Sequence, residues 1–467
     1  MNSKRILKIL IKLLLIISIN NELRIPFKTE KFTNFSKTNL LNESDIKNYL
    51  MSLIHNDIYI ELEIGSPIPQ KIKSFLKLEE YPFFIQGKDL SFSKYDETKS
   101  QTYKSELYPH VFLDGEEQIK WGYVANDTIS FHNKAELDER SLKEFNFILV
   151  TETKTNSCSN IGLMIPNQYT SIPEISFIYQ LKKQKIIDYY SFVLNYTSHE
   201  KGEGEFIIGG PPHFYDTKYN GNFYETQNAI NKPKYMMYGL EFHSINYGNN
   251  KTNIGGSLQS KFLSDFGLIA GTNAFNEIIT EKFFNEYLLD EICFKSEIKS
   301  NIEWREGEKN FEFFYCKKNE VNIHNFNSIK FIHQKLNFTF EFNYNELFED
   351  IGNYYIFKII FPKSNNFYWI FGKPWLEKYL MVFDQDKKTI GHYYIEKPIK
   401  KENDKNRNKE LLIIIVVFFI LIIISFISWI IYYLKRESRK RRINEINEDY
   451  EYTQESNNRE NLLINNS

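Results

Sequence analysis

The apolar run Leu411–Leu434 constrains this chain more than any other segment. It contains no charged residue, and its polar side chains are two serines, Ser425 and Ser428, and a pair of tyrosines near its end. A stretch of this length can cross a bilayer as one helix. We therefore expect a transmembrane helix over 411–434, with the folded body confined to the residues before it. A buried helix of a soluble domain is the alternative.

The residues that flank this run predict its orientation. Six basic residues follow the run and crowd its C-terminal side: Lys435, Arg436, Arg439, Lys440, Arg441 and Arg442. Such a cluster favours the cytoplasmic side of a membrane, and it could also hold anionic lipid. We therefore expect a single-pass type I protein, with a mixed-charge stalk at 399–410 and a cytoplasmic tail at 435–467. The N-terminal part is then luminal or extracellular, in the secretory or endolysosomal pathway or at the cell surface.

The first residues of the chain have the layout of a secretory signal. Lys4, Arg5 and Lys8 precede the apolar run Leu13–Ile19, and a basic start before a short apolar core is typical of a signal peptide. We expect residues 1–20 to be this signal, although an N-terminal membrane anchor is the alternative. Residues 21–56 are polar and irregular in pattern, so we expect ordered structure to start near Ile58.

Composition and motif spacing exclude several classes of function. The net charge is −2, so no global electrostatic field points to nucleic acid. The nine histidines and three cysteines show no His-x-x-x-His or Cys-x-x-Cys pair, so we expect no metal site. A phosphate-binding glycine-rich loop is also lacking, so no cofactor is expected.

Sheet structure is favoured by both composition and pattern. The chain has 40 phenylalanines and 31 tyrosines, residue types that suit strands. Alternation of apolar and polar residues over 58–64 predicts a half-buried strand.

Short motifs occur in a consistent order along the chain. They begin with Ile60–Gln70 (IELEIGSPIPQ) and continue with Tyr95–Tyr103, Gly122–Ile129, Ile161–Leu163, Gly204–Gly210, Leu268–Gly271, Trp369–Gly372 and Tyr379–Asp384. In this order they resemble the strands and turns of pepsin-like aspartic peptidases, the peptidase A1 family. The agreement of many pieces at sensible spacing makes the resemblance specific for the fold.

The resemblance implies a mainly β, bilobal fold with a cleft between two pseudo-symmetric lobes, plus the C-terminal transmembrane helix. The N-terminal lobe is expected at 57–212 and the C-terminal lobe at 213–398. Residues 21–56 would be propeptide-like, because Leu23–Lys28 resembles the start of a pepsin-type propeptide. Cys293 and Cys316 lie where the family has a disulfide in its second lobe. Cys158 is left over, either buried or as a free thiol.

Both catalytic turns depart from the family pattern. Counting from Gln70 without gaps places Lys77-Leu78-Glu79 on the first Asp-Thr-Gly, and counting back from Leu268 places Leu263 on the second aspartate. The family shares one proton between two carboxylates. Lysine has donors but no acceptor, and leucine cannot transfer a proton. A side chain at position 79 would also clash with or alter a turn built for glycine.

Two details of the turns stay open from the sequence. A two-residue gap would instead seat Asp265 in the second turn, as a residual catalytic candidate without a neighbouring aspartate in the first lobe. Otherwise Asp265 is a solvated turn residue, and Lys77 could likewise be a solvated residue at a strand end. The stretch 114–117, where the family has its flap, lacks a clear tyrosine.

We therefore expect a membrane-anchored pseudoenzyme whose cleft binds an extended peptide or protein loop by strand-type hydrogen bonds. An active membrane-anchored aspartic endopeptidase is one alternative. A surface glycoprotein that uses the fold as a rigid body with a closed cleft is another. Glycosylation sequons occur before the apolar run at Asn34, Asn42, Asn126, Asn195, Asn250 and Asn337.

Overall fold

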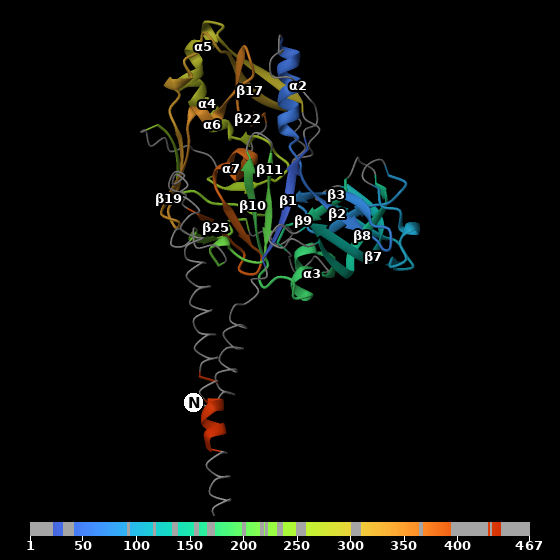
Figure 1. The fold of residues 1–467 in the computed structure, drawn as a ribbon. Helices are drawn as coiled ribbons and strands as arrows, with labels where there is room; N and C mark the ends of the chain where they lie inside the picture. Colours follow the sequence, from blue (N-terminus) through green and yellow to red (C-terminus); the bar gives the residue numbers. More distant parts are fainter. Residues whose placement is uncertain are drawn as a thin grey trace, which may run out of the picture. The chain divides into compact units, whose positions relative to one another are not determined.

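The structure, a computed structural model, describes most of the chain between residues 22 and 393 and two short pieces near the C-terminus. The described residues are 22–30, 42–90, 94–114, 118–132, 139–153, 158–165, 173–198, 202–214, 219, 223–230, 237–248, 258–299, 310–363, 368–393, 428–429 and 432–439. They fall into two units, Met1–Tyr394 and Ile395–Ser467. The first unit contains every strand found among these described residues (Figure 1).

The first half of the folded unit is mainly strand. Its strands are β1 (Leu23–Thr29), β2 (Ile58–Ile64), β3 (Gln70–Lys77), β4 (Phe83–Gln86), β5 (Lys104–Ser105), β6 (His110–Asp114), β7 (Gln118–His132), β8 (Glu139–Thr153), β9 (Asn160–Gly162), β10 (Ser191–Ser198) and β11 (Glu203–Ile208). Its α-helices are α2 (Glu43–Ile54) and α3 (Phe177–Lys183). Short 3-10 turns lie at Glu97–Lys99, Pro173–Ile175 and Pro212–Phe214.

The second half repeats this mixture with more helix. Its strands are β12 (Phe223–Gln227), β13 (Ser244–Tyr247), β14 (Ser260–Phe262), β15 (Ile269–Ala270), β16 (Cys293–Lys299), β17 (Asn310–Lys317), β18 (Ile329–His333), β19 (Phe338–Phe342), β20 (Phe348–Asp350), β21 (Tyr354–Phe357), β22 (Ile359–Pro362), β23 (Trp369–Phe371), β24 (Met381–Asp384) and β25 (Thr389–Tyr393). Its helices are α4 (Asn273–Ile279), a π-helical turn at Thr280–Phe284, α5 (Asn285–Leu289), α6 (Tyr344–Leu347) and α7 (Lys373–Lys378), with a 3-10 turn at Ile323–Asn325.

The sheet topology contains the same strand arrangement twice. In the 14-stranded sheet, β9 runs parallel to β3 and antiparallel to β4, which in turn is parallel to β8. In the 8-stranded sheet, β23 runs parallel to β14 and antiparallel to β15, which is parallel to β22. The late strand β24 pairs with β10 and so ties the end of the unit to its first half. The predicted mainly β, duplicated fold is therefore confirmed.

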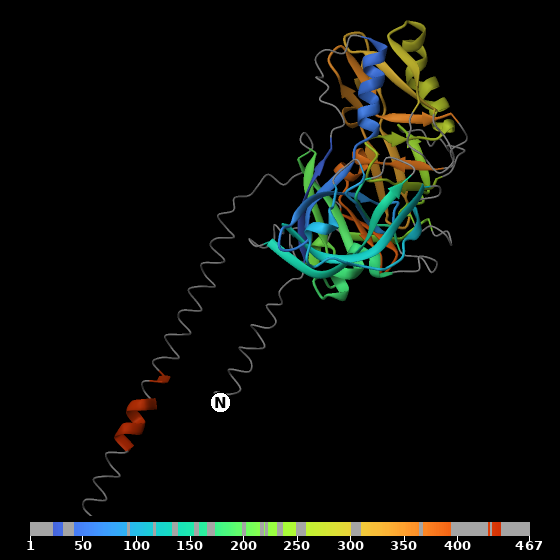
Figure 2. The ribbon, with the colours of Figure 1, turned by 90° about the vertical axis from the view of Figure 1, so that its right-hand side faces the viewer.

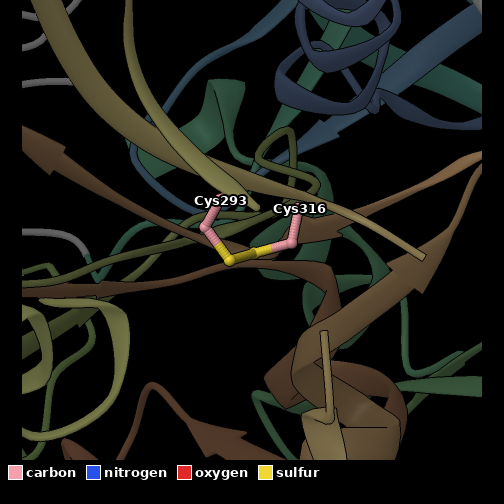
Figure 3. The surroundings of a disulfide bond; sticks show 2 residues. All are labelled: Cys293 and Cys316. Atoms are coloured by element: carbon pink, nitrogen blue, oxygen red, sulfur yellow. A yellow bond between two sulfur atoms is a disulfide. The ribbon is translucent and has the colours of Figure 1, made fainter. Parts of the chain in front are cut away.

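The predicted strand over 58–64 is also confirmed, because β2 covers these residues with its apolar side chains buried in alternation. The predicted disulfide is present between Cys293 and Cys316, which face each other on the paired strands β16 and β17 (Figure 3). Cys158 is half-buried and lies outside this disulfide.

The expectation that residues 21–56 are irregular is wrong for the part that the structure describes. Strand β1 pairs with β11 on one side and with β2 on the other, so it is an interior strand of the large sheet. Helix α2 begins at the cap residue Asn42, whose side chain accepts a hydrogen bond from the Asp45 amide. Among the described residues, the first strand therefore begins at Leu23, and the alternating apolar side chains of β1 are buried between two partner strands.

The predicted transmembrane run lies mostly outside the described residues. In the parts of the chain that the structure describes, no helix is long and apolar enough to cross a membrane. Residues 428–429 and 432–439 are helical, and the side chains of Trp429, Tyr432, Tyr433 and Leu434 are exposed.

Candidate functional site: two facing turns and the segment that covers them

The turns after β3 and β14 are tied to each other by one serine. The Ser264 hydroxyl donates to the carbonyl oxygen of Leu76 at 2.6 Å and accepts from the Leu78 amide at 3.1 Å. Ser264 is fully buried, so both hydrogen bonds are shielded from water. Lys77 and Leu263 therefore lie on two turns that are joined directly, one from each half of the unit.

The backbone of each turn is hydrogen-bonded to a neighbouring segment, and this arrangement is similar in the two halves. The amide of Leu163 donates to the carbonyl oxygen of Lys77 at 2.8 Å, just after β9. In the second half, the Leu263 amide donates to the carbonyl oxygen of Phe371 at 3.0 Å, at the end of β23. The backbone of both turns is thus fixed by the repeated strand arrangement.

Lys77 occupies the centre of this site as a paired cation. Its Nζ lies 2.7 Å from Oδ1 of Asp57 and 2.8 Å from Oδ2 of Asp265. The three side chains are 16 %, 18 % and 26 % exposed, in the order Lys77, Asp57 and Asp265. The interpretations of Lys77 as a solvated strand-end residue and of Asp265 as a solvated turn residue are therefore wrong, since each one satisfies the other's charge.

The electrostatics of this cluster keep Lys77 and Asp265 charged. Burial alone would lower the pKa of Lys77, but the carboxylates of Asp265 and Asp57 raise it well above its usual value. Burial would raise the pKa of Asp265, but the ammonium of Lys77 overcomes this and lowers it. The pair therefore consists of a protonated Lys77 and an ionised Asp265.

Glu79 adds a second acid beside Asp265, at a site where the sequence offered no neighbouring aspartate in the first lobe. Burial, followed by the negative charge of Asp265, raises the pKa of Glu79 well above its usual value. Glu79 in turn lowers the pKa of Asp265 through a side-chain hydrogen bond. Oε2 of Glu79 is buried and has no hydrogen-bond partner among the described residues. Burial and the neighbouring charge of Asp265 therefore favour the protonated form of Glu79.

The chain segment before β2 covers the second turn through its backbone. His55 forms an isolated antiparallel bridge with Phe266, the Asn56 amide donates to the Asp265 carbonyl at 3.1 Å, and the Gly267 amide donates to the Ile54 carbonyl at 3.3 Å. This backbone approach depends on Gly267, where an added Cβ would lie 1.9 Å from the carbonyl oxygen of Leu53. The second turn is therefore paired with residues of the same chain.

Helix α2 continues this cover over the neighbouring sheet. Its buried residues, at the spacing of one helix face, are Ile46, Tyr49, Leu50 and Ile54. They form one apolar cluster with side chains on and beside β15, β17, β21 and β22, among them Leu268, Phe311, Phe313, Ile356 and Ile360. Both ribbon views show α2 beside these late strands (Figures 1 and 2). The hydroxyl of Tyr49 also donates to Glu349 at 2.5 Å.

Leu263 lies half-buried and packs against this apolar cluster. It brings a hydrocarbon side chain to the position that the ungapped count assigns to the second aspartate. The acidic groups near the two turns include Asp57, Asp265, Glu79 and Glu80, and the first two are bound to Lys77. Such a cluster can hold charge and one shared proton, but its carboxylate acceptors are largely used by the ammonium.

Asp57 is the functional residue that the sequence did not reveal. It lies directly before β2, at the first residue of the expected N-terminal lobe, and no motif marks it. A buried lysine needs a carboxylate partner, but this requirement does not indicate which acidic residue of the sequence supplies it. The β6–β7 hairpin is present where the flap was expected, but residues 115–117 lie outside the described residues.

The predicted sequons lie in different environments. Asn42 and Asn337 are exposed, whereas Asn126 and Asn195 are half-buried within strands β7 and β10. Oδ1 of Asn126 is buried and has no hydrogen-bond partner in the described part of the chain. Asn34 and Asn250 lie outside the described residues. In the same described part, no cluster of three histidine, cysteine or acidic residues could hold a metal ion.

A duplicated β fold with two linked turns at the junction of its halves defines the pepsin-like class of aspartic peptidases. The family described as "Eukaryotic aspartyl protease" matches residues 86–393, and the chain belongs to this family. The matched span contains the second turn and begins after the first turn, which holds Lys77 and Glu79. No curated protein matches the chain significantly.

Solved structures agree on the fold. An aspartic proteinase from Irpex lacteus is 14 % identical with a TM-score of 0.53, and the match covers 75 % of this chain and 97 % of the proteinase. Basic 7S globulin from soybean is 13 % identical with a TM-score of 0.55, and the match covers 80 % of this chain and 95 % of the globulin. At these identities the likeness establishes the architecture and leaves the activity to the site itself.

Proposed function

We propose that this member of the aspartyl protease family is catalytically inactive and that its two turns are closed by its own N-terminal segment. The observation that carries the proposal is the position of the Lys77 ammonium between Asp57 and Asp265, within 2.8 Å of both. The proposed role is that of a rigid membrane-anchored body in the secretory route or at the cell surface.

The chemistry of the site supports inactivity. Peptide hydrolysis in this family needs one carboxylate to activate water and a second group to donate a proton to the amide. Lys77 offers no acceptor, and Leu263 offers no exchangeable proton. Asp265 is an acceptor, but its carboxylate is held by the ammonium of Lys77. A water molecule in this position would face a cation instead of a base.

The covering of the two turns by the chain's own N-terminal segment favours the rigid-body role over the binding of an extended peptide. Residues Ile54–Asp57 pair with the second turn, and α2 covers the apolar face of the adjoining sheet. A peptide that bound along the turns by strand-type hydrogen bonds would have to displace this segment and leave Lys77 with one carboxylate. We therefore expect an extended peptide to bind only when residues 42–57 have moved.

One observation favours an active peptidase as the second candidate. Glu79 and Asp265 form a protonated acid beside an ionised acid, which is the protonation pattern that peptide hydrolysis uses. In this alternative, removal of residues 21–57 would take Asp57 away from Lys77. Catalysis would then run through Glu79 and Asp265, and it would need Lys77 to swing away from Asp265.

A cleavage assay separates these candidates. The purified full-length chain, intact or nicked after residue 57 and then freed of the released segment, is incubated with an unfolded protein between pH 3 and pH 6, beside a heat-inactivated control. We expect no cleavage by either form. Cleavage that appears on nicking and is lost in both Asp265→Asn and Glu79→Gln would support the active peptidase and overturn the proposal.

A further inference from the structure

Two buried histidines meet where two separate sheets of the folded unit pack together. His392 lies on β25 of the 14-stranded sheet, and His333 lies on β18 of a 3-stranded sheet formed by β13, β18 and β19. Their exposed fractions are 0 % and 4 %. The site described above does not involve either residue.

His392 is enclosed by aromatic rings instead of polar groups. Its ring centroid lies 4.4 Å from that of Phe338 and 5.1 Å from that of Phe340, both on β19. Tyr224 of β12 stacks on its other side at 5.7 Å. Neither ring nitrogen has a hydrogen-bond partner among the described residues. A neutral imidazole fits this environment, whereas an imidazolium would be buried with its two donors unsatisfied.

His333 also depends on its neutral form. Its Nδ1 accepts a hydrogen bond from the Leu336 amide at 3.2 Å, within the turn that joins β18 to β19. Because an imidazolium donates from both nitrogens, protonation would abolish this acceptor. A cavity of about 220 Å³, lined by His243, His333 and Phe338 among others, lies beside the ring.

The charged groups around the pair do not favour protonation. The charge of a protonated His333 would lower the pKa of His392, and the ammonium of Lys335 lowers the pKa of His333. Two acids on the packed strands are engaged in ion pairs: Glu225 of β12 binds Lys387, and Glu341 of β19 binds Lys330. Burial lowers the pKa of both His333 and His392 to about 4.

We propose that His333 and His392 form an acid-sensitive junction, at which protonation releases the 3-stranded sheet from β25. The unfolded chain binds protons at each histidine near the ordinary pKa of about 6.5, while the closed junction resists them until about pH 4. The stabilising effect of the neutral pair is therefore complete above pH 6.5 and is lost as the pH falls toward 4. For each histidine, the ratio of closed to open junction falls by up to about tenfold per pH unit.

Hydrogen–deuterium exchange of the full-length chain tests this junction between pH 7 and pH 4, after correction for the intrinsic pH dependence of exchange. We expect protection in β18, β19 and β25 to fall with pH, ahead of protection in β2 and β3. The double variant His392→Leu, His333→Asn should lose most of this pH dependence, because Asn keeps an acceptor for Leu336 and neither residue titrates. His324→Asn, at an exposed histidine, should behave like the wild type.

Uniform protection across the chain at pH 4, or an unchanged pH dependence in the double variant, would overturn the proposal. Should the double variant not fold, exchange at the histidine C2 positions of the wild-type chain decides the matter. Midpoints near 4 for His333 and His392 are expected, and a midpoint near 6.5 for either one contradicts a closed, neutral pair.

Discussion

The ammonium of Lys77 lies 2.8 Å from the carboxylate of Asp265, across 188 residues of chain. This ion pair joins the first turn to the second at the point where related enzymes bring two acids together. With Asp57 on its other side, Lys77 changes the site from a proton-sharing pair into a charge-satisfied link. In the proposed inactive protein, the same contact that joins the two halves also occupies the carboxylate that hydrolysis would need as an acceptor.

Replacing Lys77 should destabilise the fold strongly. Lys77→Met leaves the carboxylates of Asp57 and Asp265 buried without a cation, and breaking a buried pair in this way costs about 3–5 kcal/mol. Urea unfolding at pH 7 measures the loss. Lys71→Met, at an exposed lysine of the same strand, should change stability by less than about 0.5 kcal/mol. Equal effects of the two substitutions would show that Lys77 is not a buried ion-pair partner.

Removing the serine that links the turns should loosen them. Ser264→Ala deletes a buried hydroxyl that donates to Leu76 and accepts from Leu78. Leaving these backbone groups unsatisfied costs about 1–3 kcal/mol. Ser264→Thr keeps the hydroxyl and should retain most of the stability in the same urea titration. If the alanine variant is as stable as the wild type, the link between the turns is not formed.

Stability should also depend on pH through Glu79. Burial and the charge of Asp265 raise the pKa of Glu79 in the folded state. The unfolded chain releases this proton near the ordinary pKa of about 4.3, whereas the folded chain still holds it above that pH. The stabilisation from this proton is complete below that value and is lost as the pH rises. Glu79→Gln should therefore gain stability relative to the wild type between pH 5 and pH 8, and gain none at pH 4. Thermal unfolding across this range checks the sign, and a gain confined to acidic pH would contradict it.

The substitution Gly267→Ala should detach the segment that covers the second turn, which consists of α2 and the residues that follow it up to Asp57. In Gly267→Ala, the new Cβ would lie 1.9 Å from the Leu53 carbonyl, so the backbone of residues 53–56 must move. We expect faster hydrogen exchange and earlier proteolysis within α2, with little change in β7 and β8. Unaltered protection of α2 in this variant would show that the segment does not approach the turn as closely as described.

The disulfide should contribute a separate increment of stability. Cys293 and Cys316 are 23 residues apart and buried, and closing a loop of this size stabilises by about 3 kcal/mol in the chain-entropy model. The variant Cys293→Ala, Cys316→Ala should lose about this amount in urea unfolding. A reduced wild-type chain serves as the comparison, and it should unfold at nearly the same denaturant concentration as the variant.

The fold could be predicted from the sequence because its strands and turns leave short, local sequence patterns. Alternating side chains over 58–64 and glycines at 162 and 372 mark strands and close backbone contacts that any chain with this topology requires. The disulfide could be predicted in the same way, from two cysteines at positions that the family pattern already assigns.

The site was harder to predict because its partners are distant in sequence. Lys77 and Leu263 could be placed by counting from nearby motifs, but nothing local reveals that Asp57 turns toward Lys77. Helix α2 was missed although Ile46, Tyr49, Leu50 and Ile54 have helical spacing behind the cap residue Asn42, because the whole segment was interpreted as polar and irregular. Its stability comes from packing on the second sheet, and packing between distant segments is invisible to a local pattern.

Calorimetric titration of the full-length chain with pepstatin at pH 4–5 tests the central claim most directly, because this inhibitor occupies the paired acids of an aspartic peptidase. With Lys77 between Asp57 and Asp265, the account predicts no binding heat, both for the intact chain and for a chain nicked after residue 57. Binding of one inhibitor per chain that is lost in Asp265→Asn would contradict it.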